Sequence, residues 1–259
     1  MELGIRGRSA LVCASSRGLG LACASALAAE GVDLVLNGRN ADRLADAAAR
    51  LRAAHEVAVT EVVADVTTAD GRGRLLDCCP EPDILVTNNN GPSPGTFTEF
   101  TEEDWMTAVS ANMVSQLMLV STVVPGMRAR HFGRIVNITS AMVTTPRPTM
   151  GLSSAARAGL TAALKGLSFE VVRDNVTINN LLPERIDTDR QRFMAARVME
   201  REGITYEVAR TRQEASVAAG RLGTPEEFGV VCAFLCSARA GFVSGNNVHV
   251  DGGTYPALI

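Results

Sequence analysis

The chain has 259 residues, enough for one large domain or two small ones. Hydrophobic residues make up 46% of the chain and charged residues 20%, which is typical of a folded globular protein rather than a disordered one. The formal net charge of −3 argues against a nucleic-acid or membrane-surface binder, and no apolar stretch approaches the roughly 18 uninterrupted residues of a spanning helix.

Short apolar runs alternate with longer segments of helical periodicity along the chain. The apolar runs predict buried strands at residues 9–14, 32–36, 57–64, 83–87, 133–139, 176–182 and 247–250. The helical segments are residues 19–30, 40–54, 105–124 and 154–172, and a further helix starts at residues 224–227 (TPEE). This alternation predicts an α/β fold: a single-domain Rossmann-type doubly wound parallel sheet over residues 1–259, with helices on both faces.

Three stretches that follow predicted strands are rich in loops or charges: residues 91–100, 144–153 and 184–223. In a doubly wound sheet, ligands bind beyond the carboxyl ends of the strands. We therefore expect these stretches to form the rim of the site. The last one, at about 184–223, is mostly helical by pattern and is predicted to be a substrate lid.

Cysteine and histidine usage gives no sign of a disulfide framework or a metal site. The six cysteines lack disulfide spacing, and none of the three histidines lies near a CxxC pair. The N-terminal residues also lack the layout of a signal peptide. We therefore expect a cytoplasmic protein without metal.

The first predicted strand runs into a glycine-bearing turn, residues 14–20 (ASSRGLG), which is followed by a helix. Gly18 and Gly20 allow a tight turn and a close approach of the backbone to a ligand. The N-terminus of the following helix offers unpaired N–H groups and a positive dipole end to a pyrophosphate. A strand, this turn, a helix and a second strand in succession indicate a dinucleotide site.

The charge after the second predicted strand indicates which dinucleotide binds. NAD binders usually place an acidic residue there to hold the ribose 2′-hydroxyl, but residues 37–40 (NGRN) contain no carboxylate. Arg39, with Arg17 from the glycine turn, could clamp a 2′-phosphate, because a guanidinium matches phosphate bidentately. The pattern favours NADP(H), with NAD(H) as the alternative and with two solvated loop arginines as the simpler interpretation.

These motifs resemble the short-chain dehydrogenase/reductase family, and within it the 3-oxoacyl-carrier-protein reductase-like members. The resemblance covers nearly the whole chain, through residues 14–20, 83–91 (DILVTNNNG), 137–140 (NITS), 183–188 (PERIDT) and 250–253 (VDGG). It implies a small carbonyl or hydroxyl substrate and a homodimer or homotetramer. It also implies the following cofactor contacts: Ala14, Ser16, Arg17, Gly18, Leu19, Gly20, Arg39, Asp65, Val66, Asn88, Arg157, Pro183, Ile186 and Thr188.

The family's chemistry uses a serine, a tyrosine and a lysine, supported by an asparagine. The resemblance places Ser140 at the serine and Asn112 at the asparagine. The YxxxK motif is expected 13 residues after the serine, where Ser153 and Arg157 stand instead. Neither of the two tyrosines has a lysine four residues later, so no realignment restores the motif.

These replacements change what the pair can do. Arg157 can hold a ribose hydroxyl and carry positive charge, but its guanidinium stays protonated and cannot relay a proton. Ser153 is too short to reach the position of a tyrosine hydroxyl and is a far weaker acid than phenol. The candidate replacement acids are Glu184, which stands where the family has glycine, Tyr206 in the lid, and a water held by Ser140, Ser153 and Asn112.

Two of these residues also have simpler interpretations. Glu184 could point into solvent or pair with Arg185, Arg157 or Arg190. Thr188, which the resemblance places at the nicotinamide carboxamide, could instead form a capping box with Gln191.

The leading prediction is an NADP-dependent oxidoreductase that acts on a carbonyl/hydroxyl pair with an atypical catalytic set. Ser140 would polarise the substrate oxygen, Arg157 would hold the ribose, and Asn112 would support a water. Two alternatives stay open: a cofactor-binding sensor or partner subunit without redox turnover, and a lyase or isomerase that uses the same pocket. The cofactor motifs favour the first two, whereas the altered tyrosine–lysine pair favours the alternatives.

Overall fold

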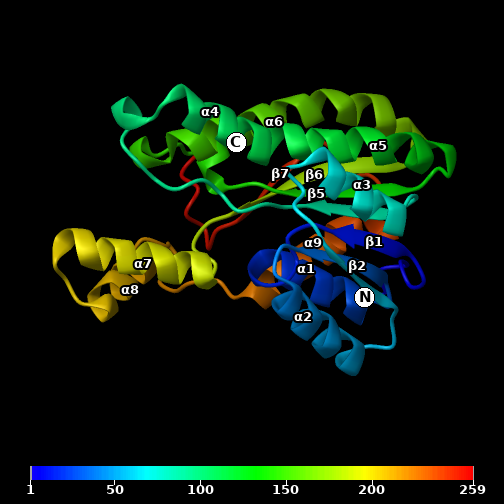
Figure 1. The fold of residues 1–259 in the computed structure, drawn as a ribbon, viewed down its shortest axis with the longest axis horizontal. Coiled ribbons are helices and arrows are strands. Elements are labelled where there is room, and N and C mark those ends of the chain that lie inside the picture. Colours follow the sequence, from blue (N-terminus) through cyan, green and yellow to red (C-terminus); the bar gives the residue numbers. More distant parts are fainter. Residues whose placement is uncertain (1, 259) are drawn as a thin grey trace.

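Seven parallel strands form the centre of the molecule, in the order β3-β2-β1-β4-β5-β6-β7 (Figure 1). The computed structural model describes residues 2–258. The strands are β1 (Ser9–Val12), β2 (Asp33–Gly38), β3 (Val59–Val63), β4 (Ile84–Thr87), β5 (Gly133–Ile138), β6 (Val176–Pro183) and β7 (Asn247–Val250). The strand order reverses between β1 and β4, so the predicted doubly wound Rossmann-type sheet is confirmed.

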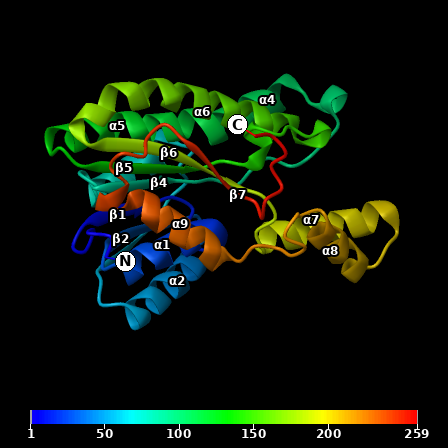
Figure 2. The same ribbon diagram turned by 180° about the vertical axis from the view of Figure 1, so that it is seen from behind.

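Helices cover both faces of the sheet (Figures 1 and 2). One layer contains α1 (Gly18–Ala29), α2 (Ala41–Ala54) and α9 (Pro225–Cys236). The other contains α3 (Ala69–Cys78), α4 (Glu102–Val109), α5 (Ser115–Ala129) and α6 (Gly151–Val171). Successive strand residues alternate between the two layers: Ala10 and Val12 pack in the α1–α9 core, whereas Leu11 packs in the α5–α6 core. Burial on both faces explains why each strand is a continuous apolar run in the sequence.

Helix α3 was missed by the sequence prediction. Its sequence (ADGRGRLLDC) contains two glycines, which are poor helix formers. The hydroxyl of Thr68 caps its first turn by accepting a hydrogen bond from the Gly71 N–H at 3.0 Å. A Cβ at Gly71 would lie 1.9 Å from the Asp65 carbonyl oxygen, so glycine is required for the helix to pack against the preceding turn.

The predicted helix at 105–124 is longer than its apolar pattern suggested and contains a π-helical turn. A capping box between Thr101 and Asp104 starts it at Glu102, and α4 continues through the π turn Ser110–Val114 into α5. By length and composition the span Glu102–Ala129 could cross a membrane, contrary to expectation. Since 44% of its most apolar window is buried, we interpret it as a core helix of the folded domain.

Residues after β6 project from the body as an arm of two helices, α7 (Asp189–Glu202) and α8 (Tyr206–Ala215) (Figures 1 and 2). The Gln213 side chain of α8 donates to the backbone carbonyl of Gln191 on α7 at 2.9 Å. An ion pair of 2.9 Å between Arg210 and Asp187 ties α8 to the segment that leaves the sheet. These two helices occupy the region predicted to be a lid.

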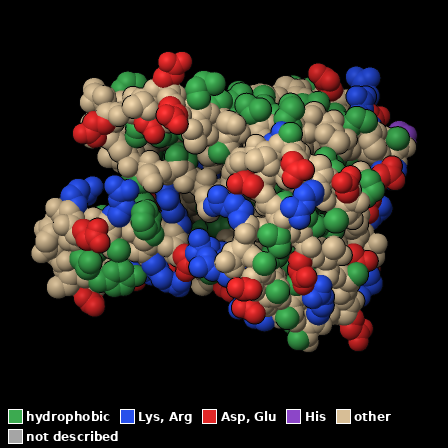
Figure 3. All heavy atoms as spheres, in the orientation of Figure 1, with side chains coloured by type: hydrophobic (Ala, Val, Ile, Leu, Met, Phe, Trp, Pro, Cys, Tyr) green, Lys and Arg blue, Asp and Glu red, His purple; other side chains and the backbone are tan. Residues whose placement is uncertain are grey.

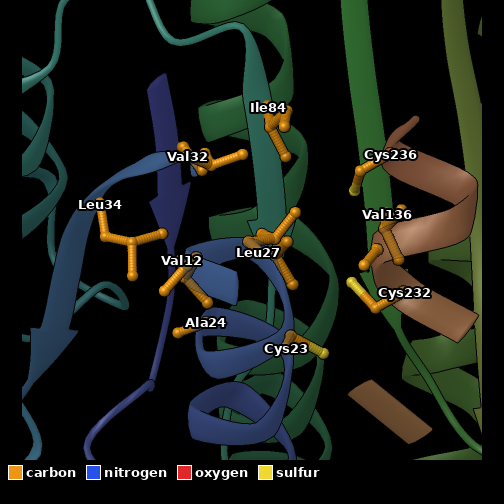
Figure 4. Packing of buried hydrophobic residues seen from close by; sticks show 14 of the residues in the cluster. Val12, Cys23, Ala24, Leu27, Val32, Leu34, Ile84, Val136, Cys232 and Cys236 are labelled. Carbon is orange, nitrogen blue, oxygen red and sulfur yellow. The ribbon is translucent and has the colours of Figure 1, made fainter. Parts of the chain in front are cut away.

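Close packing of α9 against α1 fixes the helix that begins at the glycine turn (Figure 4). Cys23, Cys232 and Cys236 lie together in this core. A hydrogen bond with the Cys23 thiol, together with burial, raises the pKa of Cys232 well above its usual value. A Cβ at Gly229 would lie 2.5 Å from the Ala22 carbonyl oxygen. The two helices are therefore held at a separation that only glycine permits.

We expect Gly229→Ala to lower the free energy of unfolding by about 1–3 kcal/mol, because the added methyl group would push α9 away from α1. Chemical denaturation measures this change. Gly166→Ala is the matched control, since it lies on α6 with no atom within 4 Å of an added Cβ, and it should raise stability by up to about 1 kcal/mol. Equal effects of the two substitutions would contradict the proposed contact.

Candidate active site

The glycine turn forms a cradle at the carboxyl end of β1. Ala14 stands in the left-handed region, with φ of 47°, and its N–H donates to the Asn37 side chain at 3.2 Å. A Cβ at Gly20 would lie 2.4 Å from the Ala14 carbonyl oxygen, so the turn folds tightly onto the start of α1. Gly18 also has positive φ, and its nearest neighbour beyond the turn is the Thr188 side chain. Backbone N–H groups at this end of α1 are placed to bind phosphate.

Asn37 holds the cradle together and was not predicted as a site residue. Its side-chain amide donates to the carbonyl oxygens of Val62 and Ala64, at 3.2 and 2.9 Å, so it links β2 to β3. Its backbone N–H donates to the hydroxyl of Ser15 at 3.0 Å. An asparagine within a buried apolar strand is a signal that could have identified it, because a buried amide needs hydrogen-bond partners.

Arginines surround the end of the cradle where a 2′-phosphate would lie. Arg39 is 3.7 Å from Asp65, and Arg17 forms a 2.8 Å ion pair with Asp189; all four side chains are partly exposed. A pocket of about 310 Å³ beside them has the following lining residues: Ser16, Arg17, Arg43, Asp46, Arg50 and Asp189. Arg43 and Arg50 were missed by the sequence analysis, although their seven-residue spacing on α2 puts them on one helix face.

The other cofactor contacts implied by the sequence lie along the same edge of the sheet. Leu19 is in the first turn of α1, and Val66 follows β3. The side chain of Asn88, just after β4, donates to the Ala14 carbonyl oxygen at 3.4 Å. Pro183 ends β6, and the buried Ile186 pairs with Gly223 in an isolated bridge.

The capping box expected between Thr188 and Gln191 is wrong. Thr188 is the N-cap residue of α7, but its side chain makes no capping hydrogen bond. The Gln191 side chain instead accepts a hydrogen bond from Arg185 at 3.0 Å, because Arg185 turns back toward α7. The Thr188 side chain therefore remains directed toward Gly18, at the mouth of the cradle.

Arg157 joins three elements at the carboxyl ends of β4 and β5. Its Nη1 donates to the carbonyl oxygens of Ile138 and Thr139, at 2.8 and 2.9 Å. Its Nη2 donates to Asn112 Oδ1 at 3.3 Å and to the Asn89 carbonyl oxygen at 3.4 Å. Burial, together with the nearby charge of Arg190, lowers the pKa of Arg157 to about 10. The guanidinium is therefore a buried cation at neutral pH.

Two serines lie beside this cation. Ser140 directly follows the Ile138–Thr139 segment, and its hydroxyl oxygen accepts a hydrogen bond from the Met142 N–H at 3.2 Å. Its O–H group is thus left to donate to a ligand. Ser153 is buried one helical turn before Arg157, and within residues 2–258 its hydroxyl has no hydrogen-bond partner. We call Asn112, Ser140, Ser153 and Arg157 the polar cluster.

The Glu184 carboxylate forms ion pairs with two arginines. Its Oε1 lies 3.2 Å from Arg147 Nη2 and 3.3 Å from Arg185 Nε, and the carboxylate is 9% exposed. Pairing with Arg185 was anticipated, whereas the contact with Arg147, from the loop after β5, was not. Both guanidinium groups contact the same carboxylate oxygen, so this side chain is already engaged by arginine. This arrangement argues against Glu184 as the replacement acid.

Tyr206 is the first residue of α8, in the projecting arm. The arginine four residues later, Arg210, pairs with Asp187 and with the Gln213 side chain. This YxxxR sequence therefore belongs to the internal packing of the arm. Across the described part of the chain, no cluster of three His, Cys, Asp or Glu side chains could hold a metal ion.

Comparison with known proteins identifies the family. A family model described as enoyl-(acyl carrier protein) reductase matches residues 13–255. The chain is 32% identical over 250 residues to human dehydrogenase/reductase SDR family member 4, covering 95% of this chain and 86% of that protein. The chain belongs to the short-chain dehydrogenase/reductase family. It is therefore an NAD(P)-dependent oxidoreductase by family, and the resemblance inferred from its motifs is confirmed at that level.

Two relatives of known structure share the whole fold of this short-chain dehydrogenase/reductase. L-sorbose reductase from Gluconobacter frateurii, complexed with NADPH and L-sorbose, has 32% identity and a TM-score of 0.94, with complete coverage of both chains. YwfH, an NADPH-dependent reductase involved in bacilysin biosynthesis, has 28% identity and a TM-score of 0.91, covering 97% of this chain and 99% of that one. The NADPH-dependent reductase BacG of Bacillus subtilis is 29% identical over 256 residues, 97% of this chain and 99% of that protein.

The left-handed Ala14 gives a testable consequence of the cradle geometry. A residue with a Cβ is strained at positive φ, and we expect Ala14→Gly to raise the free energy of unfolding by about 0.5–1 kcal/mol. The control is Ala26→Gly, inside α1, which should lower it by about 1 kcal/mol. Urea denaturation of the three proteins measures both changes, and a loss of stability in Ala14→Gly would contradict the strain.

Proposed function

We propose that this protein is an NADPH-dependent reductase of small carbonyl compounds that works without a tyrosine–lysine pair. The observation that carries the proposal is the hydrogen-bond network of Arg157, which stands where the family has its lysine. The guanidinium binds Asn112 and the strand end that leads to Ser140. An arginine bonded on all these sides supports a site that is organised around it, not one that has collapsed after losing its catalytic pair.

The residues of the cradle fit a phosphorylated dinucleotide. The tight turn at Gly20 and the N-terminus of α1 would bind the pyrophosphate. Arg17, Arg39 and Arg43 would bind the 2′-phosphate, for which their guanidinium groups offer paired donors. When bound, the reduced nicotinamide supplies the hydride for the reaction. NADPH in the sorbose reductase complex supports this choice over NADH.

The polar cluster would activate the carbonyl group. The Ser140 hydroxyl donates a hydrogen bond to the carbonyl oxygen and polarises it. Negative charge grows on that oxygen as the carbonyl carbon is reduced, and the buried charge of Arg157 stabilises it because little water screens the interaction. A water held by Ser140, Ser153 and Asn112 would pass a proton to the alkoxide as it forms and take up another from bulk solvent, since Glu184 is ion-paired and Arg157 cannot relay a proton.

Retention of the cofactor without turnover is the second candidate function. It is favoured by the lack of a side chain in the polar cluster acidic enough to give up a proton near neutral pH, since serine hydroxyls and guanidinium are very weak acids; the protein would then be a sensor or partner subunit. NADPH binding with no oxidation across small ketones and 3-oxoacyl thioesters would establish that function and exclude ours. Turnover of a substrate without any dinucleotide would instead indicate a lyase or isomerase.

We expect Ser140→Ala to lower kcat for NADPH oxidation by about 10²–10³-fold, because a donor aimed at the developing oxyanion is lost. Steady-state absorbance of NADPH with the best ketone of the panel measures this rate. Ser154→Ala is the control: Ser154 lies in the first turn of α6 next to Ser153, and its hydroxyl is buried without a hydrogen-bond partner in the described chain. A similar rate for both variants would remove Ser140 from the reaction.

Arg39→Gln tests the cofactor assignment. Loss of a charged hydrogen bond to phosphate, worth about 1.5–3 kcal/mol, should weaken NADPH binding by roughly 10–100-fold. The Kd for NADH should stay within about twofold, because NADH lacks the 2′-phosphate. Calorimetry measures both constants, with Arg74→Gln on α3 as the control. Equal weakening of NADPH and NADH would contradict the role of Arg39.

A further inference from the structure

Two arginines converge on Gly91, just beyond β4, with no carboxylate between them. A Cβ built at Gly91 would lie 3.6 Å from Arg157 Nη2 and 4.0 Å from Arg190 Nη2. Burial lowers the pKa of both side chains, and the charge of Arg190 adds to the lowering at Arg157. Among residues 2–258 neither one forms an ion pair.

The partners of these arginines are neutral. Arg157 binds three backbone carbonyls and an amide oxygen, and Arg190 Nη2 donates to the Pro92 carbonyl oxygen at 2.9 Å. Such acceptors satisfy individual N–H groups but leave the positive charge uncompensated. Arg157 is buried and Arg190 is half-buried, and holding two such cations close together is costly unless an anion joins them. The arrangement is therefore suited to an anionic ligand.

The nearby carboxylate does not fill this role. Glu184 is shared by Arg147 and Arg185, so it does not neutralise Arg157 or Arg190. Figure 3 shows several basic side chains around the hollow between the α7–α8 arm and the body. Arg157 and Arg190 therefore remain without a carboxylate partner in the described chain.

The position of Arg157 and Arg190 indicates whether the anion belongs to the cofactor or to the substrate. The cofactor's phosphates would be bound at the N-terminus of α1 and beside Arg39, on the β1–β2 side of the switch point. Arg157 and Arg190 meet beyond β4, and Arg157 binds the Thr139 carbonyl next to Ser140. The nicotinamide ring carries no negative charge in either redox state. The substrate must then bring the anion.

We propose that the physiological substrate is an oxo acid, a small carbonyl compound with a carboxylate group, and that Arg190 binds this carboxylate. The inference rests on the proposed reductase function and names its substrate class. Arg190 is the specificity-determining residue: one of its N–H groups is held by Pro92, which leaves the rest of the guanidinium to grip a carboxylate. The buried guanidinium of Arg157, which also lies close to Gly91, adds its positive charge to the attraction for this carboxylate. Because Arg190 is the second residue of α7, binding would also tie the arm to the substrate.

Matched pairs of acids and methyl esters test the substrate class. The pairs are 2-oxobutanoate, acetoacetate and levulinate, each against its methyl ester, with NADPH oxidation as the measurement. We expect kcat/KM for at least one acid to exceed that for its ester by 30-fold or more. Equal rates for acid and ester in all three pairs would overturn the proposal while leaving the reductase function intact.

Arg190→Gln assigns the carboxylate site. We expect KM for the preferred acid to rise at least tenfold, with kcat/KM for its ester changing less than threefold and the NADPH Kd less than twofold. Arg197→Gln is the control, because Arg197 is exposed and lies 5.9 Å from the same Phe193 ring that Arg190 approaches at 5.7 Å. A matching loss of NADPH affinity in Arg190→Gln would instead assign Arg190 to the cofactor's phosphates.

A binding measurement separates the two hypotheses if no carbonyl compound is reduced. Calorimetry of the NADP⁺-loaded protein with the three oxo acids should then still detect binding that Arg190→Gln weakens at least tenfold. That result would reject the reductase function and retain the carboxylate site. Failure of all three acids to bind the loaded protein would reject the site itself. Melting temperatures of the variants within about 2 °C of the parent show that the fold is intact.

Discussion

The hydrogen bonds from the Arg157 guanidinium to the carbonyl oxygens of Ile138 and Thr139 are the interaction on which the site depends. They fix the end of β5, from which Ser140 follows, and the same guanidinium reaches Asn112 in the π turn and Asn89 after β4. The strand end, the long helix and the β4 loop are thus held by one buried cation. Its planar set of donors serves this purpose better than a single ammonium group, which presents its donors as a compact point charge.

The other charged side chains differ from this cation in whether a carboxylate pairs with them. All but one of the 25 basic residues are arginine, and they serve two opposite functions. Several of those along the arm and the surface pair with carboxylates, as in Arg210–Asp187 and Arg52–Glu61. At Arg157 and Arg190 no carboxylate compensates them within the described chain, so the fold maintains a positive site beyond β4. The contrast between paired and unpaired arginines is the basis of the substrate class proposed above.

Most of the sheet and its crossover helices could be predicted because their signals are local. A strand buried on both faces needs an apolar run, as in residues 83–87, and a crossover helix needs a periodic apolar face. Helix α3 escaped prediction because Gly71 and Gly73 weaken its pattern, and its glycine is required by a contact with Asp65 that only the folded chain creates. The capping box at Thr188 failed for a similar reason: Gln191 has a better partner in Arg185.

By itself the sequence determined the doubly wound sheet, because periodicity along the chain predicts its strands and helices. The resemblance of its motifs to a known family then indicated the family and the places of Ser140, Ser153 and Arg157. The tertiary structure decided which charges meet. Glu184 pairs with Arg147, 37 residues away in the sequence, and Arg43 and Arg50 join Arg17 only when α2 packs beside α1. Ion pairing depends on distances across elements, and those distances exist only after the hydrophobic core has brought the strand ends together.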